Sequence, residues 1–437
     1  MRVLFIPWGQ ASHYLYQVPL AWAFRADGDE VRVVSQPGAA DAIKRSGMSV
    51  MVVGESYDFM PELAAFSEES RRDMQRLQST VSSKFRQHNP QPGDGNSALV
   101  PTSPIDEKKR KEFAAKRKAI MQAKLTPFCR AAQVMADDVV LLARAWQPDL
   151  VVSDPLVMAA PLAARAAGAP LVHLQWGPAV QRMTGLFPCN GVSPDLWPGE
   201  LRDLYARYDT EPAAEHAAAT VDSCPAALQY DETIPSRIPA RFVPYNGTGD
   251  APRWLTEPPR RPRICVNWGT TTTTLVGAEG FLVPRILDAL AGFDVEVVVT
   301  IRPADRPLLG DDLPGQVRVA ENLPLHLLLP SCDAVIHHGG SATMLTAASF
   351  GLPQLLLSPG IVDNMANGER IAATGAGVSL NWADASTETI TAGIKTILSD
   401  ETVRQAARNL RDEIRAHPAP ADVAATLRQF TTRQQAA

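Results

Sequence analysis

Residues 334–354 read AVIHHGGSATMLTAASFGLPQ, and this stretch is the most informative part of the chain. Its first five residues are mostly apolar, as in a buried strand, and two glycines then lead into a helix that we expect to begin near Ser341. Glycine lets the backbone approach a ligand closely, and the free N–H groups at a helix start suit an anion such as a diphosphate. The alternative is a plain glycine turn with Ser341 as the N-cap.

The same alternation of short apolar segments and longer amphipathic segments continues on both sides of this stretch. It is typical of parallel strands that are covered on both faces by helices. The sequence therefore predicts an α/β protein of two tandem Rossmann-like, doubly wound domains, with a ligand cleft between them. The strands expected are 1–6, 30–35, 48–53, 149–153 and 170–176 in the first half, and 264–268, 295–301, 317–321, 334–338, 354–358 and 378–380 in the second.

Proline, arginine and glycine gather at 235–262, which has no sustained periodicity and indicates a domain boundary. We place an N-terminal domain at 1–240, a linker at 241–262, a C-terminal domain at 263–415 and a C-terminal helix at 416–437 that packs back on the first domain. An insertion at about 59–125 holds a loop-like segment, 88–104, and a basic helix, 106–124. That helix is either a solvated surface helix or a docking element or lid.

Charge and motifs exclude several classes of protein. The 437 residues carry 42 Lys+Arg and 47 Asp+Glu, so the net charge of −5 offers no overall basic surface for nucleic acid. Five cysteines stand singly, which makes a zinc knuckle or a disulfide framework unexpected. The chain has no P-loop motif, and no G-x-G-x-x-G follows an expected strand, so a P-loop nucleotide site and a dinucleotide-binding dehydrogenase are not supported. It has no H-E-x-x-H or comparable carboxylate cluster, so we expect no metal site. No targeting signal or membrane span stands out, and we expect a cytoplasmic protein.

A histidine and an aspartate each follow an expected strand of the first half. His13 comes shortly after the first strand, and Asp154 ends the segment DLVVS. Because parallel strands end at the same edge of a sheet, we expect these side chains to meet at the cleft. An imidazole can take a proton from a hydroxyl group, and a carboxylate can fix its tautomer. The alternatives are a packing histidine and a helix N-cap.

Four motifs then carry a resemblance to a known family: CVNWGTT at 265–271, NLPLHLLLP at 322–330, HHGGSAT at 337–343 and PGIVDN at 359–364. In this order they resemble the nucleotide-sugar glycosyltransferases of the GT-B fold. The resemblance is closest to the actinobacterial enzymes that attach deoxysugars to macrolide and aromatic polyketide antibiotics. It covers nearly the whole chain, including the first strand and the phrase PLAWAFRADGDEVRVVSQP at 19–37.

The resemblance implies a role for each matching residue. His13 would be the base that activates the acceptor, and Asp154 its acidic partner. Residues 337 and 339–343 would hold the diphosphate opposite 270–271, residues 319–323 would hold the nucleobase, and residues 363–364 would contact sugar hydroxyls. Two positions depart from the family: Ala342 replaces a glycine and Asn364 replaces a glutamine. The implied donor-binding residues are Trp268, Thr270, Thr271, Val319, Leu323, His337, Gly339, Gly340, Ser341, Ala342, Thr343, Asp363 and Asn364.

By the same resemblance, the chain would move a deoxysugar from TDP, or from UDP, to a hydroxyl group or an aromatic carbon of a polyketide-type natural product, with inversion and without a cofactor. Aromatic residues of the first half indicate a large apolar acceptor, and we expect Trp8, Phe59 and Trp176 in its pocket. A cytochrome-like auxiliary protein docking on the insertion, and a homodimer, are further partners that stay open, whereas neither nucleic acid nor a membrane is expected. Two other functions also stay open: a sugar-nucleotide epimerase of the same architecture and a non-catalytic nucleotide-sugar-binding partner.

Overall fold

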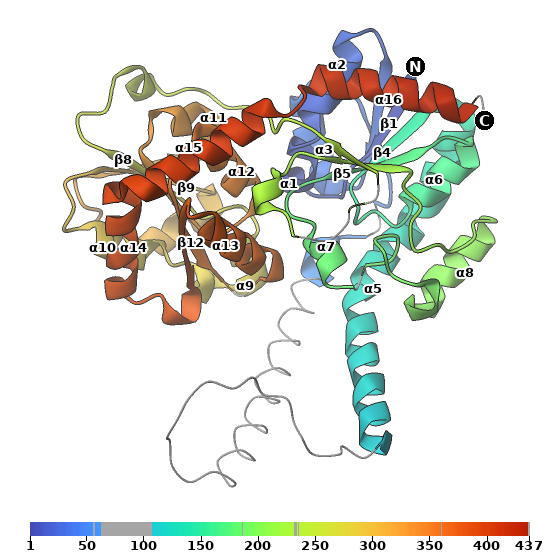
Figure 1. Ribbon diagram of the computed structural model, residues 1–437, viewed down its shortest axis with the longest axis horizontal. Helices are drawn as coiled ribbons and strands as arrows, with labels where there is room; N and C mark the ends of the chain where they lie inside the picture. Colours follow the sequence, from blue (N-terminus) through green and yellow to red (C-terminus); the bar gives the residue numbers. More distant parts are fainter. Residues whose placement is uncertain are drawn as a thin grey trace.

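The computed structural model describes residues 1–55, 57–62, 107–185, 187–230, 234, 236–359 and 361–435, with the backbone alone at 107–124, 362, 430 and 432–435. The expected loop at 88–104 and most of the expected insertion lie outside the described residues. Within them the chain forms two parallel β-sheets, each in its own α/β layer arrangement (Figure 1). The architecture of two doubly wound α/β domains predicted from the sequence is therefore confirmed.

The first sheet has seven described strands in the order β3-β2-β1-β4-β5-β6-β7, all parallel. The order reverses between β1 and β4, which is where ligands of doubly wound sheets bind. The strands are β1 Arg2–Ile6, β2 Glu30–Ser35, β3 Val50–Val52, β4 Leu150–Ser153, β5 Leu171–Gln175, β6 Ala219–Asp222 and β7 Arg237–Pro239.

The second sheet has six described strands in the order β10-β9-β8-β11-β12-β13, again parallel. Its order reverses between β8 and β11, so the chain after each of these strands lies at the equivalent point of the second domain. The strands are β8 Arg263–Asn267, β9 Glu296–Ile301, β10 Val317–Glu321, β11 Ala334–His337, β12 Gln354–Ser358 and β13 Gly377–Asn381.

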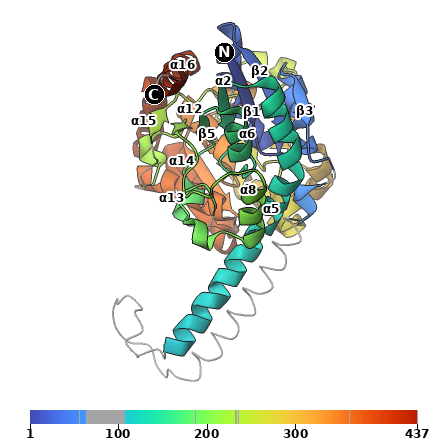
Figure 2. The ribbon, with the colours of Figure 1, turned by 90° about the vertical axis from the view of Figure 1, so that its right-hand side faces the viewer.

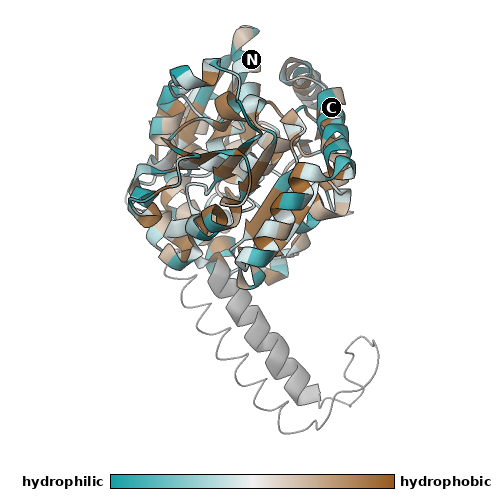
Figure 3. Cartoon of the chain, turned by 90° about the vertical axis from the view of Figure 1, so that its left-hand side faces the viewer, coloured by the Kyte–Doolittle hydropathy of each residue, from teal (hydrophilic) through white to brown (hydrophobic). Residues whose placement is uncertain are grey.

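Helices cover both faces of each sheet because the side chains of successive strand residues point to opposite faces. In β1, Leu4 and Ile6 pack under α5, α6 and α8, whereas Val3 and Phe5 pack under α1, α2, α3 and α16. In Figure 3 the strands are largely apolar, and polar residues lie along the outer helices. The helices of the first layer arrangement are α1 Ala11–Leu15, α2 Val18–Ala26, α3 Pro37–Arg45, α5 Glu107–Trp146, α6 Ala160–Ala167, α7 Val180–Met183 and α8 Gly199–Arg207.

The second sheet is covered by α10 and α14 on one face and by α11, α12, α13 and α15 on the other. The last helix, α16, crosses back to the first domain and packs on α2 (Figures 1 and 2), where Arg428 forms ion pairs with Asp27 and Asp29. The helices here are α9 Thr272–Val276, α10 Val283–Leu290, α11 Leu325–Leu328, α12 Ser341–Phe350, α13 Val362–Thr374, α14 Thr387–Ser399, α15 Glu401–Ala416 and α16 Pro420–Gln435.

Most expected strands lie where the pattern puts them, and those at 30–35, 317–321 and 354–358 have the same limits in the structure. Two strands were not expected. β6 is short, and β7 falls inside the proline-rich segment at 235–262, whose composition indicates a boundary without regular structure. β7 is an edge strand of the sheet, and an edge position tolerates Pro239 because a missing N–H is least disruptive there.

Two further features bear on the sequence-based expectations. No helix among the described residues has both the length and the apolar character needed to cross a membrane. The five cysteines, all within the described ranges, are buried and unpaired.

Candidate active site

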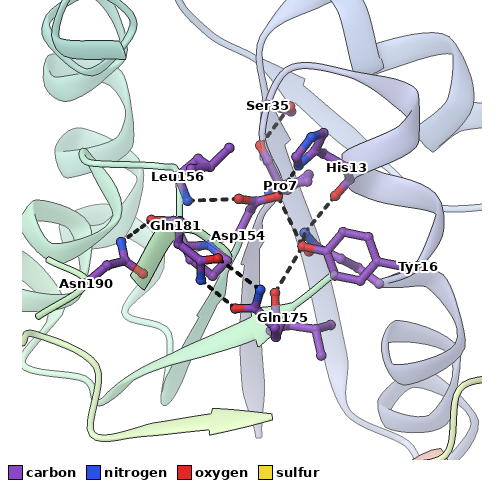
Figure 4. Close-up of polar contacts among 12 residues, drawn as sticks. Pro7, His13, Tyr16, Ser35, Asp154, Leu156, Gln175, Gln181 and Asn190 are labelled. Atoms are coloured by element: carbon purple, nitrogen blue, oxygen red, sulfur yellow. Dashed lines mark hydrogen bonds and ion pairs between the residues drawn. The ribbon is translucent and has the colours of Figure 1, made fainter. Parts of the chain in front are cut away.

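The first domain carries a histidine–carboxylate pair at the point where its strand order reverses. β1 and β4 pair so that Ile6 lies beside Ser153, which brings the residues after both strands to one edge of the sheet. His13 lies in α1 and Asp154 directly follows β4, and His13 Nδ1 is 2.7 Å from Asp154 Oδ2 (Figure 4). The side chain of Asp154 is fully buried, whereas that of His13 is 20% exposed.

The carboxylate fixes the proton of the imidazole. Because a carboxylate only accepts hydrogen bonds, Nδ1 donates to it and the lone pair of His13 is on Nε2. Burial lowers the pKa of His13, but the charge and hydrogen bond of Asp154, together with the charge of Asp363, outweigh burial and raise it above its ordinary value. The other oxygen of Asp154 accepts from the backbone N–H of Leu156 at 2.8 Å. Geometrically, this pair can act as a base through Nε2.

The three aromatic residues expected in the acceptor pocket lie in the first domain. Trp176, which follows β5, packs on the imidazole of His13 with ring centroids 5.2 Å apart. Trp8 and Phe59 contact each other at 4.5 Å, and both contact Phe128 of α5, at 5.2 and 4.9 Å. The structure therefore brings Trp176 to His13, and it buries Trp8 and Phe59 against Phe128 in the same hydrophobic core cluster that contains Trp176. Phe128 was not expected, because nothing in its sequence context distinguishes it from the core face of a long helix.

In the second domain, the loop from β11 into α12 is built on its two glycines. Gly339 has φ +97°, and a Cβ there would lie 2.8 Å from the carbonyl oxygen of Asn364 in α13. Only glycine fits this approach. Gly340 is the N-cap of α12, and Ser341 is its first residue. Ala342 lies within this helix and does not have a positive φ. Alanine is therefore accommodated there without strain in place of the family's glycine.

An asparagine that the sequence did not single out holds this loop. Asn367 of α13 is fully buried and donates its amide N–H groups to the carbonyl of Gly339 at 2.8 Å and to Ser341 Oγ at 2.9 Å. Its place one turn after Asn364 on the same helix is the signal that could have identified it. The start of α12, which is ten residues long, is thus held from α13 with its first N–H groups free of intrahelical partners.

The structure corrects the expected role of His337. Its ring is fully buried, Nδ1 accepts from the N–H of Gly339 at 3.1 Å, and Nε2 contacts Gln354 Oε1 at 3.0 Å. Both ring nitrogens are therefore engaged within the protein, and the side chain has no free donor for a phosphate. Burial lowers the pKa of His337 to about 3 and that of His338 to about 4, so both rings are neutral near pH 7.

The neighbouring His338 instead packs between the two loops at this edge. A Cβ on Gly269, after β8, would lie 2.3 Å from its ring, and a Cβ on Gly340 would lie 2.6 Å from it. The sequence does not show which of the two adjacent histidines has its ring nitrogens engaged within the domain. The strand ends at His337, so the alternation of side chains between the two faces of the sheet does not extend to His338.

Trp268 also differs from the expectation. Its indole is fully buried, donates to the carbonyl of Gly280 at 2.8 Å and packs on Phe281, so the side chain does not border an open nucleobase pocket. The hydroxyl of Thr343 donates to Asn267 Oδ1 at 3.1 Å and is likewise used within the domain.

The remaining expected donor-side residues lie at the carboxyl edge of the second sheet or next to it. Thr270 is exposed and Thr271 is half-buried at the start of α9. Val319 is half-buried in β10, and Leu323 follows that strand in the core. Asp363 lies at the start of α13, where burial raises its pKa against the lowering effect of His13. The charges of Asp363 and His13 therefore interact across the two domains.

The two domains also touch directly at the start of α12. A Cβ on Gly177, which follows β5 in the first domain, would lie 2.7 Å from Ser341 Oγ. The structure thus brings together the His13–Asp154 pair, Trp176, Asp363 and the free end of α12. No group of three or more residues able to hold a metal ion occurs in the described part of the chain.

Comparison with known proteins shows which family this chain belongs to. Residues 91–269 match the model of the erythromycin biosynthesis protein CIII-like N-terminal domain, and residues 284–430 match the model of the corresponding C-terminal domain. The chain is 33% identical to the 10-deoxymethynolide desosaminyltransferase of Streptomyces venezuelae, over all of this chain and 98% of that one. It is 32% identical to the tylactone mycaminosyltransferase of Streptomyces fradiae, over 99% of this chain and 92% of that one.

Solved structures of glycosyltransferases are also similar to this chain over nearly its whole length. The glycosyltransferase VinC in complex with dTDP superposes with a TM-score of 0.74 at 27% identity, covering 99% of this chain and all of that one. The spinosyn rhamnosyltransferase SpnG complexed with spinosyn aglycone gives a TM-score of 0.70 at 26% identity, covering 98% and 100%. The chain therefore belongs to the erythromycin biosynthesis protein CIII-like family and is a GT-B glycosyltransferase of the macrolide and polyketide type.

Proposed function

We propose that this glycosyltransferase moves a deoxysugar from TDP to a hydroxyl group of a polyketide-type natural product, with inversion at the anomeric carbon. The observation that carries the proposal is the 2.7 Å contact between His13 and Asp154, which leaves the lone pair of His13 Nε2 free. In the reaction the acceptor hydroxyl gives its proton to Nε2 while its oxygen bonds to the anomeric carbon. The bond from that carbon to the diphosphate breaks, and the nucleoside diphosphate leaves.

We assign the stabilisation of the departing diphosphate to the start of α12. Negative charge grows on the diphosphate as the bond breaks, and the positive end of a helix dipole together with free N–H groups stabilises that charge. Gly339 and Gly340 allow the approach, and the hydroxyl of Ser341 adds a donor. Because this dispersal of charge needs no metal, we expect turnover to persist in EDTA. His337 has no part in this step, since both its nitrogens are engaged.

The choice of substrates is supported by the relatives. The glycosyltransferase VinC was solved in complex with dTDP, and the rhamnosyltransferase SpnG was solved with spinosyn aglycone. In this chain, we assign to Trp176, beside His13, an apolar wall for such an acceptor, and to Asp363, whose charge acts on His13, the hydrogen bonds from sugar hydroxyls. Matches to named sugar transferases favour transfer over the epimerase and the non-catalytic alternatives. The auxiliary protein and the homodimer stay predictions.

The test is turnover of a panel of TDP- and UDP-deoxysugars with macrolide and aromatic polyketide aglycones, read by mass spectrometry. We expect a product from a TDP-sugar, with the anomeric configuration inverted in its NMR spectrum. His13→Ala should lose about 10²- to 10⁴-fold in turnover, the usual contribution of a general base, and should still be stabilised by TDP in a thermal-shift assay. Turnover of His13→Ala near the wild-type rate would refute the assignment of the base, and a retained configuration would refute inversion.

A further inference from the structure

A third side chain joins the His13–Asp154 pair. The hydroxyl of Tyr16, which caps the end of α1, lies 3.1 Å from Asp154 Oδ2, the same oxygen that His13 Nδ1 contacts (Figure 4). It also lies 3.0 Å from the backbone carbonyl of Leu174 in β5. The chain thus places a phenol and an imidazole on one carboxylate oxygen, although Tyr16 and Asp154 are 138 residues apart.

The position of Tyr16 is fixed by Gln17, which is fully buried. The amide of Gln17 donates to the hydroxyl oxygen of Tyr16 at 3.1 Å and to the backbone carbonyl of His13 at 3.0 Å. One side chain therefore links the backbone that carries the imidazole to the phenol. This arrangement holds the hydroxyl against the carboxylate independently of any ligand.

The phenol hydroxyl has one hydrogen to donate, and both the carboxylate of Asp154 and the carbonyl of Leu174 lie within reach. The charge of the acceptor decides which of the two receives this hydrogen bond. Hydrogen bonds to an ionised group are about twice as strong as those between neutral groups. An ionised Asp154 therefore attracts this hydrogen more strongly than the carbonyl of Leu174 does. Asp154 then accepts from His13, from Tyr16 and from the N–H of Leu156, which satisfies a carboxylate that has no exposed surface.

We propose that Tyr16 is a positioning residue of the catalytic pair, which shares the charge of Asp154 and so limits how firmly that carboxylate holds a proton on His13. This inference rests on the proposed role of His13 as the base. A base that is held too firmly in its protonated form is inactive at neutral pH, so a second donor on the carboxylate widens the pH range in which Nε2 is free.

The direction in which loss of the Tyr16 hydroxyl moves the pKa of His13 follows from the groups that face His13. Asp154 after β4 and Asp363 of α13 are the charges that raise its pKa, and Trp176 after β5 packs on its ring. Burial and the charge of Asp154 raise the pKa of Tyr16 well above its ordinary value, so the phenol stays protonated across the working range. Without its hydrogen bond, more of the charge of Asp154 acts on the imidazolium, and His13 should lose its proton only at a higher pH.

The test is the pH profile of kcat/KM for Tyr16→Phe, since its acid limb reports the base of the free enzyme. We expect the midpoint of that limb to move upward by up to roughly one pH unit, with little loss of kcat/KM above it and unchanged affinity for TDP. Tyr14→Phe is the matched control. The hydroxyl of Tyr14 contacts Ser46 Oγ at 2.5 Å and makes no contact with Asp154, so its profile should superimpose on the wild type.

A second variant should move the acid limb of the pH profile in the opposite direction. It also tests the inference if Tyr16→Phe does not fold. Replacement of Tyr16 by 3,5-difluorotyrosine keeps the ring and makes the phenol a stronger donor, so the acid limb should move downward. Profiles that superimpose on the wild type, or a loss that is equal at every pH, would overturn the inference while leaving His13 as the base. Full turnover of His13→Ala would instead overturn the proposed role of His13 as the base.

Discussion

Gly177 and Ser341 meet across the two domains so closely that no side chain fits between them. A Cβ on Gly177 would lie 2.7 Å from Oγ and 2.8 Å from Cβ of Ser341. Gly177 belongs to the loop after β5 that also carries Trp176, and Ser341 is the first residue of α12. The loop beside the proposed base therefore touches the proposed diphosphate site, and a side chain at position 177 would clash with Ser341.

Gly177→Ala should hold the domains apart, because the backbone of Gly177 accepts alanine and only the contact with Ser341 does not. We expect kcat/KM to fall at least about tenfold, since small displacements of reacting groups are costly. Steady-state kinetics would measure this loss. Gly292→Ala is the matched control, because a Cβ there meets nothing within 4 Å.

The same contact predicts a rescue. Ser341→Gly removes both atoms that the new methyl group would meet, so the double variant Gly177→Ala, Ser341→Gly should be no worse than Ser341→Gly alone. Losses that simply multiply in the double variant would show that Gly177→Ala acts through its own loop and not through Ser341.

His337 should be a structural residue and not a ligand of the diphosphate. In His337→Leu, the N–H of Gly339 and the side-chain oxygen of Gln354 lose their buried partner, which costs about 2 kcal/mol and lowers Tm by several degrees. His337→Asn keeps an acceptor near the position of Nδ1, so we expect it to retain TDP affinity within about threefold by calorimetry. A tenfold weaker affinity for TDP at unchanged Tm would identify a direct phosphate contact instead.

Asp363 should influence the base from the opposite domain. Burial lowers the pKa of His13, but the charges of Asp154 and Asp363 raise it further than burial lowers it. Asp363→Asn removes one of these charges, so His13 should lose its proton at a lower pH, and the acid limb of kcat/KM should move downward. If Asp363 also binds sugar hydroxyls, KM for the donor rises in the same variant.

The pH profiles of Asp363→Asn and of the control Asp384→Asn, an exposed aspartate of the same domain, would be compared in parallel. An acid limb that stays in place in Asp363→Asn would show that the two domains do not share charge at this site.

The sequence was sufficient for the parts of the site that depend on local pattern. The strand before His337, the glycines at 339–340 and the helix start at Ser341 are contiguous, and each obeys a local rule of conformation. Asp154 could be paired with His13 because both follow strands that end at one sheet edge. By contrast, β7 was missed because three residues at a sheet edge leave little periodic signal. Asn367 was missed because its place one turn after Asn364 suggests only a shared helix face and does not show which atoms its amide contacts.

By itself, the sequence determined the two doubly wound sheets, because strands buried on both faces require continuous apolar segments separated by helices. It also determined which loops reach the ligand edge. Tertiary structure alone decided that Tyr16 shares an oxygen of Asp154 with His13, that His337 faces inward, and that Gly177 touches Ser341. These contacts join residues far apart in the chain or fix the partners of one of two adjacent histidines, and their geometry is set by packing between elements, which no local pattern encodes.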